Sequence, residues 1–255
     1  MNESQLSDVE DACLNASAPP QQLWLDGWLV RFCPGKAKRA RSINAVATGR
    51  LPLAEKLERA AAIFLGAQLP LVVRITPFSQ PADLDTVLAT MGYARFDPTH
   101  VMVAAVDTQA PARELPSGCT LERADALQYS EVVGALRGSA PSLRASHAQR
   151  LRLSPVPYEG WFIKRGAQVL ACGQFAREGQ FVGLYDVYTA PEARGQGWAK
   201  SLCSRLLGLA AAQGAHTAYL QVAADNVPAM AVYRALGFAT GYDYHYRALD
   251  PTSAL

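Results

Sequence analysis

Residues 187–199 read VYTAPEARGQGWA, and this stretch decides the fold class of the C-terminal half. Residues Phe181–Thr189, which overlap the start of this stretch, alternate as a strand does. The leucines of Trp198–Gln213 have the spacing of a helix. Gly195 and Gly197 lie in the loop between the two. Glycines let successive N–H groups point at one spot, and a helix N-terminus adds unpaired donors and a positive dipole end. The loop is either an anion site that would fit a pyrophosphate or a plain turn that starts a helix.

The residues around this loop predict a mixed α+β layer. Gly166 and Gly179 mark tight turns, which favours an antiparallel meander, and Gly214 marks the C-terminal end of the helix. The meander strands are expected at Gly160–Arg165, Gln168–Arg177 and Phe181–Thr189. Upstream we expect a short strand at Leu121–Arg123, a helix at Asp125–Arg137 and an irregular polar segment at Ser139–Pro157.

A repeat at an offset of 145 positions links the two halves of the chain. Residues 91–94 read MGYA and residues 236–239 read LGFA, and at the same offset His100 falls on His245. Each copy follows a strand-like run and a helical stretch, as repeated supersecondary units do. The paired runs are 69–75 with 217–222, 82–90 with 227–235, 36–44 with 181–189, and the helix at 53–65 with the one starting near 197. We therefore predict a duplication, with domains at residues 1–107 and 119–255 joined by the Pro-rich segment Asp107–Gly118.

The ordered motifs of residues 120–248 resemble the GNAT superfamily of acyl-CoA-dependent N-acyltransferases. That family has an apolar strand, a proline, the pattern R/Q-x-x-G-x-G/A opening a helix, and then a strand, Asn, a helix, Tyr and Leu-Gly-Phe. The matching residues here are Val187–Thr189, Pro191, Arg194–Ala199, Leu220–Val222, Asn226, Tyr233 and Leu236–Phe238. With Trp28 opening a reduced first copy, the chain looks like a bacterial subfamily of tandem members whose substrates are largely unassigned. The resemblance implies an α+β fold of two GNAT-like mixed-sheet halves with helices packed on the sheets.

The resemblance also implies an acetyl-CoA site, with acetyl-CoA as the acyl donor. The backbone of Val187, Tyr188 and Thr189 would pair with the pantetheine arm like an added strand, and Asn226 would bond the pantetheine or simply cap a helix. The pyrophosphate would bind the amides of Arg194, Gly195, Gln196, Gly197, Trp198 and Ala199. Ala199 replaces the commoner glycine, and Trp198 is bulkier than the usual aliphatic residue and fills core space behind the loop.

Transfer to an amine needs a proton acceptor, an oxyanion donor and an acid for the leaving thiolate. Tyr233 suits the acid role, since an unperturbed tyrosine is protonated at neutral pH; otherwise it is a packing aromatic. The proton acceptor is less clear, because Gln221 stands where some members carry Glu. Asp186, in the strand beside the acetyl site, is the best remaining acid or else a strand-surface carboxylate. Glu159, Asp243 and His245 are weaker candidates.

Composition excludes several other classes of protein. The 255 residues are half apolar, and 24 Lys and Arg against 22 Asp and Glu leave a net charge of +2, too weak to argue for a nucleic-acid partner. No apolar run approaches the length of a membrane span, and the polar start lacks the pattern of a signal peptide. The five scattered cysteines predict no metal site and no disulfide framework, and so a reducing cytoplasm. The basic residues Lys36, Lys38, Arg39 and Arg41 are expected on a solvated hairpin edge.

The leading hypothesis is acetyl-CoA-dependent N-acetylation of a primary amine on a small molecule or a peptide. The alternative is a non-catalytic module in which acyl-CoA occupancy tunes a partner contact, and the question of a homodimer stays open. Only the C-terminal half is expected to bind acetyl-CoA. At the 145 offset the glycine loop falls on residues 49–54, GRLPLA, where one glycine remains and Pro52 has no N–H, and Tyr233 falls on Leu88.

Overall fold

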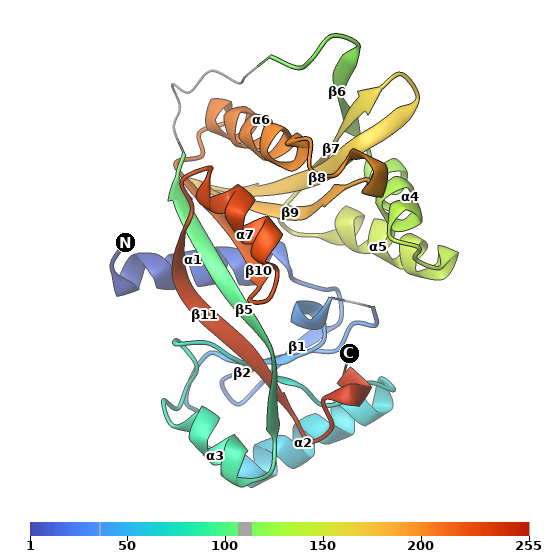
Figure 1. Cartoon of the computed structure of the whole chain (residues 1–255). Coiled ribbons are helices and arrows are strands. Elements are labelled where there is room, and N and C mark those ends of the chain that lie inside the picture. The colour runs from blue at the N-terminus through green and yellow to red at the C-terminus, as the bar shows by residue number, and fades with distance from the viewer. Residues whose placement is uncertain (36, 107–113, 255) are drawn as a thin grey trace. The chain divides into compact units, whose positions relative to one another are not determined.

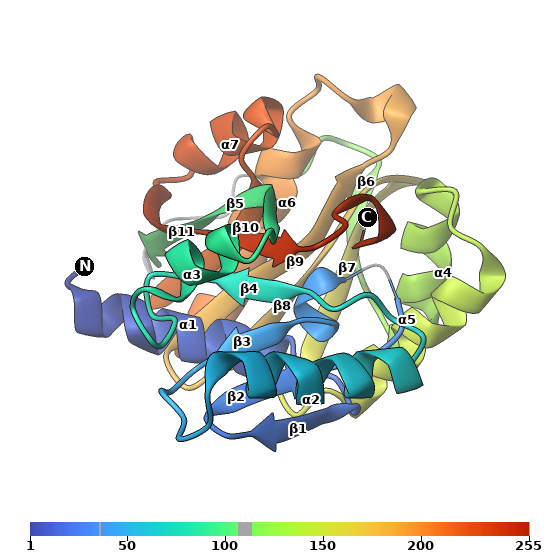
Figure 2. The same cartoon turned by 90° about the horizontal axis from the view of Figure 1, so that it is seen from below.

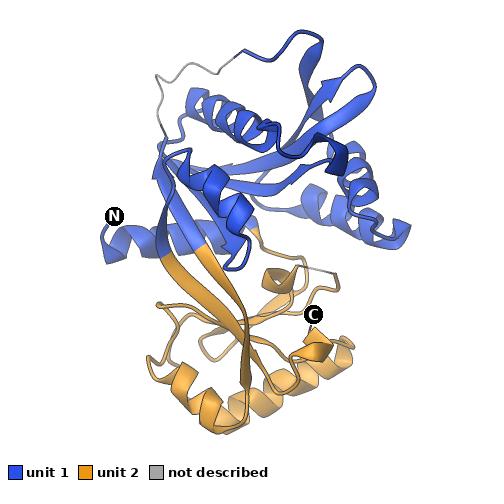
Figure 3. Cartoon of the chain, in the orientation of Figure 1, with its two compact units in different colours: residues 1–16, 101–241 blue, residues 17–100, 242–255 orange. Residues whose placement is uncertain are grey.

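The computed structural model describes residues 1–35, 37–106 and 114–254. The chain divides into two compact units: unit 1 is residues 1–16 and 101–241, and unit 2 is residues 17–100 and 242–255 (Figure 3). Two of the three divisions fall inside strands β5 (Ala94–Ala105) and β11 (Ala239–Ala248), and the third follows helix α1 (Glu3–Ala16). Unit 1 therefore contains the first residues of the chain, and unit 2 contains the last. The division in chain order, at residues 1–107 and 119–255, stays a prediction, and most of its boundary segment, residues 107–113, lies outside the described residues.

Unit 1 is built on the predicted meander, which the structure confirms. Strands β6 (Cys119–Ala124), β7 (Tyr158–Arg165), β8 (Gln168–Glu178) and β9 (Phe181–Thr189) pair antiparallel in that order (Figure 1). Strand β10 (Thr217–Ala223) then pairs parallel to β9, and the last residues of β5 lie on its other side. The sheet is therefore mixed, as expected for the predicted α+β class.

The glycine loop is followed by helix α6 (Trp198–Ala212), which packs on β8 and β9. It buries Leu202, Leu206 and Ala210, the helical spacing that the sequence predicted. Gly214 follows its end with φ +93°, a left-handed conformation that glycine adopts without steric cost. The other helices of unit 1 are α1 (Glu3–Ala16), α4 (Ala126–Leu136), α5 (Pro141–Leu153) and α7 (Val227–Arg234).

Helix α5 corrects one expectation, since residues 139–157 were predicted to be irregular. The segment forms a 13-residue helix that starts with Pro141 at its first position. Within α5, Ala148 alone is fully buried. A helix that buries so little carries no regular spacing of apolar residues, so the sequence contains no helical signal here. Packing against α4 (Figure 1), rather than sequence pattern, stabilises this helix.

Unit 2 is a smaller mixed sheet covered by two helices. Strands β1 (Gln22–Leu25), β2 (Trp28–Arg31) and β3 (Ile43–Ala45) are antiparallel neighbours, β4 (Val73–Ile75) is parallel to β3, and β11 pairs antiparallel with β4. Helix α2 (Leu53–Gly66) runs across these strands (Figure 2) and buries Leu57, Ala60 and Phe64 against Trp28 and Ile43. Helix α3 (Leu84–Thr90) buries Leu84 and Leu88 in the same core.

The two halves of the chain contain the same order of elements, as the repeat predicts. The first series is β3, α2, β4, α3 and β5, and the second is β9, α6, β10, α7 and β11. Both series start from a strand that is parallel to the next strand of the series. The duplication is consistent with this order and stays a prediction.

The basic residues near position 38 do not form a solvated edge, which corrects a second expectation. Lys38 forms an ion pair with Asp97 at 3.0 Å, and the buried Arg41 donates from Nη2 to the Ala254 carbonyl at 2.8 Å. Lys36 lies outside the described residues. The aliphatic stems of such side chains cover apolar surface while their heads find partners, which a reading of charge alone misses.

All five cysteines are free thiols, and Cys13, Cys172 and Cys203 are fully buried. They fill core space as small apolar residues, as expected. Within residues 1–35, 37–106 and 114–254, no helix has the length and apolarity that crossing a bilayer would require.

Candidate active site

Strand β9 separates from its parallel neighbour β10 halfway along its length. The pairing of the two strands ends at Leu184 and Leu220. On the other side, β8 and β9 shift register, so that Asp186 and Val187 together stand opposite the single residue Gly173. Such a bulge bends a strand and re-aims its side chains. Asp186 has φ +50°, a conformation that non-glycine residues adopt rarely and at a cost, and functional sites often contain such positions.

Beyond the bulge, one edge of β9 is open to an extended ligand. Tyr188 and Thr189 pair with Cys172 and Ala171 of β8, and the register with β10 has already ended. The backbone of Val187, Tyr188 and Thr189 therefore offers main-chain groups along a free edge. An extended chain that carries amides can bind such an edge as an added strand.

The glycine loop opens helix α6 with a run of free amides. Gly195 and Gly197 have φ +74° and +81°, and Gly197 is the N-cap of α6 without any side-chain cap. The first amide of the helix to find a carbonyl is that of Ser201, which donates to Gly197 O at 3.0 Å. Within the described part of the chain, the amides of residues 195–200 have no acceptor. Six consecutive free donors at the positive end of a helix form an anion cradle.

The space in front of this cradle is open. A Cβ atom built on Gly195 or on Gly197 would have no protein atom within 4 Å. A cavity of about 550 Å³ adjoins it and is lined in part by Gln196, Gly197, Trp198, Lys200, Ser201 and Leu236. The free amides and the adjoining cavity favour the anion site over a plain turn, and the binding of a pyrophosphate there stays a prediction.

The side chains of the loop form hydrogen bonds with one another and with β9. Arg194 donates from Nη2 to the Tyr188 hydroxyl at 3.2 Å, and Trp198 donates from Nε1 to Gln196 Oε1 at 3.1 Å. Trp198 is 5% exposed and belongs to the core of unit 1, which confirms that it fills core space behind the loop. The cradle is thus made by the backbone, whatever side chains residues 194–199 carry.

Tyr233 lies on α7, in contact with the core of unit 1 and edge-on to Phe238 at 6.1 Å between ring centroids. Burial, and to a lesser degree the neighbouring Cys203, raises the pKa of its phenol above the ordinary value. Within the described residues its hydroxyl has no hydrogen-bond partner. The hydroxyl is therefore protonated at neutral pH and free to donate, as an acid for a leaving thiolate must be.

Asp186 lies in a polar cluster formed with α4, α5 and β8. Its carboxylate accepts from Arg137 Nη1 and from Gln174 Nε2, both at 2.9 Å, and His147 Nε2 lies 3.1 Å from its Oδ2. Burial alone would raise the pKa of this carboxyl, but the hydrogen bond with His147 and the charge of Arg137 outweigh it and hold the pKa well below its usual range. Asp186 is an anion at neutral pH, and its own role as proton acceptor stays a prediction.

Asn226 is the N-cap of α7. Its Oδ1 accepts from the Ala229 amide at 3.2 Å, which confirms the capping alternative. One carboxamide can cap a helix and still bind a ligand, because its NH₂ group is separate from the capping oxygen. The pantetheine contact of Asn226 stays a prediction.

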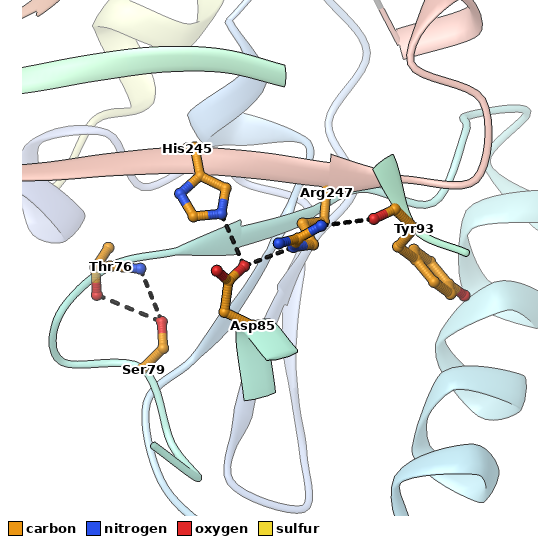
Figure 4. A network of polar contacts seen from close by, with 6 residues as sticks. All are labelled: Thr76, Ser79, Asp85, Tyr93, His245 and Arg247. Carbon is orange, nitrogen blue, oxygen red and sulfur yellow. Dashed lines mark hydrogen bonds and ion pairs between the residues drawn. The ribbon is translucent and has the colours of Figure 1, made fainter. Parts of the chain in front are cut away.

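The weaker acid and base candidates each have partners elsewhere in their own units. Glu159 lies 3.4 Å from Arg123 and accepts from Gln213 at 2.8 Å, and Asp243 lies 2.6 Å from His100. His245 belongs to unit 2, where its Nε2 lies 2.8 Å from Asp85, which Arg247 also binds (Figure 4). Figure 4 also shows Arg247 donating to the Tyr93 carbonyl, so His245 is part of a network that joins β11 to α3.

In unit 2, a carboxylate of the chain itself binds the amides just before helix α2, which the predicted repeat aligns with the glycine loop. Asp26, in the tight turn between β1 and β2, accepts from the amides of Arg50 and Leu51 at 2.8 Å each. The ammonium group of the buried Lys56 donates to the Asp26 carbonyl at 2.8 Å and lies 3.8 Å from its carboxylate. A Cβ on Gly49 would come within 2.0 Å of the Asp26 carboxylate. An internal anion therefore occupies the place that corresponds to the cradle of unit 1.

We expect Asp26→Asn to lower the midpoint of thermal unfolding at pH 7 by a few degrees. The amides of Arg50 and Leu51, and then Lys56, hold the pKa of Asp26 below its ordinary value. Because the folded pKa is the lower one, the charge stabilises the fold above the unfolded pKa of about 3.9 and loses this effect as the pH falls further. Melting curves of both proteins from pH 7 down to pH 3 should converge below about pH 4. A difference that stays constant over this range would show that the carboxylate charge has no such role.

The sequence and the fold are matched by known acetyltransferases. A family model described as "Probable histone acetyltransferase Rv0428c C-terminal" matches residues 3–247. The structure is similar to a GCN5-related N-acetyltransferase from Kribbella flavida, with a TM-score of 0.68, 18% identity and coverage of 95% of this chain and 94% of that one. The chain belongs to the GNAT superfamily of N-acetyltransferases.

Two further relatives agree with this assignment. The GNAT chain is 26% identical over 223 residues to "Uncharacterized N-acetyltransferase YobR" of Bacillus subtilis, covering 86% of this chain and 89% of that protein. A structure described as a tandem GNAT protein from the clavulanic acid biosynthesis pathway matches with a TM-score of 0.61 and 15% identity, over 78% of this chain and 70% of that one. These comparisons confirm the GNAT resemblance that the glycine loop and its neighbouring motifs indicated.

Proposed function

We propose that this GNAT protein transfers the acetyl group of acetyl-CoA to a primary amine of a small molecule or a peptide. The observation that carries the proposal is the cradle at residues 195–200, where six consecutive amides lack an acceptor within the described residues. A pyrophosphate is the part of acetyl-CoA that needs such a cradle. Unit 1 holds this cradle, the open edge of β9 and the free hydroxyl of Tyr233.

The donor substrate would bind along the β9 edge and the start of α6. The amides of Gly195, Gln196, Gly197, Trp198 and Ala199 are assigned to the pyrophosphate, whereas the predicted Arg194 amide already donates to the Pro191 carbonyl at 3.3 Å. The cavity beside Lys200 is assigned to the groups that follow the pyrophosphate. The pantetheine arm would lie along Val187, Tyr188 and Thr189, with Asn226 bonding it from the start of α7. Arg194 supports Tyr188 by its hydrogen bond to the ring hydroxyl, and its guanidinium lies 5.6 Å from the ring centroid.

The chemistry needs a proton donor for the leaving thiolate, and Tyr233 fits that role. Its phenol is protonated at neutral pH, since burial raises its pKa, and its hydroxyl has no competing partner within the described residues. The backbone N–H groups along the open edge of β9 are the candidate donors for the oxyanion, because fixed main-chain dipoles stabilise charge that develops in the transition state. The free thiols make a reducing cytoplasm the proposed compartment.

The proposed acceptor is a primary amine on a small molecule or a peptide. The matched family is described as a probable histone acetyltransferase, so a lysine-containing peptide is one probe, and a polyamine is a small-molecule probe. The alternative function, a module that binds acyl-CoA without turnover, shares the cradle. Binding alone cannot separate the two.

A thiol-release assay tests the proposal. Purified protein is mixed with acetyl-CoA and, in parallel, with a histone-tail peptide, spermidine, an aminoglycoside or no amine, and free thiol is followed by a chromogenic disulfide. Amine-dependent release above the rate without amine is the expected result, with the acetylated amine confirmed by mass spectrometry. Tight binding of acetyl-CoA with no amine-dependent release across the panel would support the binding module instead.

A further inference from the structure

The polar cluster on the side of β9 that faces α4 and α5 contains an imidazole that the sequence did not single out. His147, on α5, lies with its Nε2 3.1 Å from Asp186 Oδ2, and its side chain is 14% exposed. Its ring meets that of Tyr129 edge-on, with the centroids 6.4 Å apart. Within the described residues, no group hydrogen-bonds to its other nitrogen, Nδ1. One ring nitrogen is thus occupied and the other is available.

The Asp186 carboxylate is held rigidly in place. The buried Gln174 and the guanidinium of Arg137 both donate to this carboxylate. The hydroxyl of Tyr129 donates to the backbone carbonyl of Asp186 at 3.1 Å. The Arg137 guanidinium already balances the charge of Asp186. A carboxylate that accepts from Nε2–H fixes the neutral tautomer whose lone pair is on Nδ1.

The cluster lies beside the place where β9 leaves β10. Asp186 and Val187 are the two bulge residues, and they point to opposite faces of the sheet. Val187 lies above Gly173 with Leu202 and Leu206 of α6, whereas Asp186 faces Arg137 and His147. A thioester at the separation of the strands would therefore have α6 on one side and the imidazole on the other.

We propose that His147 accepts the proton of the acceptor amine and that Asp186 is the residue that positions it. This inference rests on the proposed function. The amine nitrogen bonds to the thioester carbonyl carbon, and its N–H proton passes to His147 Nδ1. The C–S bond breaks with its electron pair going to sulfur, and the thiolate takes the proton of Tyr233. Solvent returns a proton from the imidazolium to the phenolate, which leaves an amide and a free thiol as products.

The groups that face His147 fit this role. Asp186 of β9 and the Tyr129 ring of α4 are its direct neighbours, and Arg137 reaches it only through Asp186. Tyr129 is fully buried, and burial raises the pKa of its phenol well above the ordinary value, so the phenol stays uncharged beside His147. Asp186 alone could not take the proton, since it is a paired anion with a low pKa.

The test is chemical rescue of His147→Ala, with His216→Ala as the matched control because His216 is exposed and its amide donates to the Gln180 carbonyl, just before β9 begins. The probe acceptor is the amine of the panel that the wild type acetylates fastest. We expect His147→Ala to lower kcat by about 10²-fold, as loss of a general base does, with the KM for acetyl-CoA within about two-fold of wild type. Added imidazole should raise the rate of His147→Ala by about ten-fold or more, in proportion to the fraction of the imidazole that is unprotonated.

Three outcomes would overturn the inference. A rate for His147→Ala close to that of the wild type shows that the imidazole takes no proton. A loss of rate that imidazole cannot restore shows that the side chain only supports the fold. If the wild type itself releases no thiol with any probe although it binds acetyl-CoA, the proposed function fails and this inference with it. A circular dichroism spectrum identical to that of the wild type shows that the variant is folded.

Discussion

Gly197→Asp is expected to weaken acetyl-CoA binding by about 10²–10⁴-fold, which corresponds to the loss of one or two charge-assisted hydrogen bonds. The new carboxylate would stand where the pyrophosphate must lie, next to the free amides of the α6 start. The fold should survive, because a Cβ at this position meets no protein atom within 4 Å. An acid at a helix start is otherwise favourable, which offsets part of the strain of φ +81°. Calorimetric titration with acetyl-CoA measures the change.

Gly166→Asp is the matched control for this variant. Gly166 also has positive φ, +57°, and open space around its Cβ position, but it lies in the turn between β7 and β8. It carries the same strain and the same added charge away from the cradle, so it should bind acetyl-CoA as the wild type does. If folded Gly197→Asp keeps its affinity, the glycine loop is only a turn, and the assignment of the pyrophosphate to it is wrong.

Tyr233→Phe is expected to lower kcat by about 10²-fold, which is the lower end of the effect of losing a general acid. The affinity for acetyl-CoA should stay unchanged. The change removes one oxygen that has no hydrogen-bond partner within the described residues, so the ring and its packing against Phe238 remain. The hydroxyl acts on the sulfur as charge develops there, and its loss should therefore affect kcat more than binding. Steady-state rates and a binding titration on the same sample separate the two effects.

A second substrate sharpens this test. A thioester with a more acidic thiol needs less help from an acid, so its rate should fall less in Tyr233→Phe than that of acetyl-CoA. Tyr93→Phe, which changes a buried tyrosine of unit 2, is the control and should leave turnover unaffected. Normal turnover of Tyr233→Phe with the same acceptor would make Tyr233 a packing residue and water the proton donor.

The elements around the glycine loop were predictable because their signals are local. Alternation in residues 181–189, the leucine spacing after Trp198 and the glycines at turns each depend on neighbouring residues only. The structure confirms these strands and helices to within a few residues. The GNAT resemblance used the same local motifs.

The parts that sequence missed depend on tertiary packing. Helix α5 buries one residue fully, so its pattern gave no helical period, and the contact of His147 with Asp186 joins residues that lie far apart in the chain. The bulge at Asp186 depends on the register between β8 and β9, which no short stretch contains. The loss of the first copy's cradle was predictable from Pro52, but the carboxylate of Asp26 that fills its place was not. The Asp-Gly turn at residues 26 and 27 was the one local signal for it.

The central claim is that acetyl-CoA binds one site per chain, at the cradle of unit 1. Calorimetric titration of the whole chain with acetyl-CoA tests it most directly, with the Gly197→Asp variant titrated in parallel. The account predicts one site per chain in the wild type, and in the variant no site of wild-type affinity, because Asp26 and Pro52 leave unit 2 without a cradle. Two sites per chain, or one site that persists in the folded variant, would contradict it.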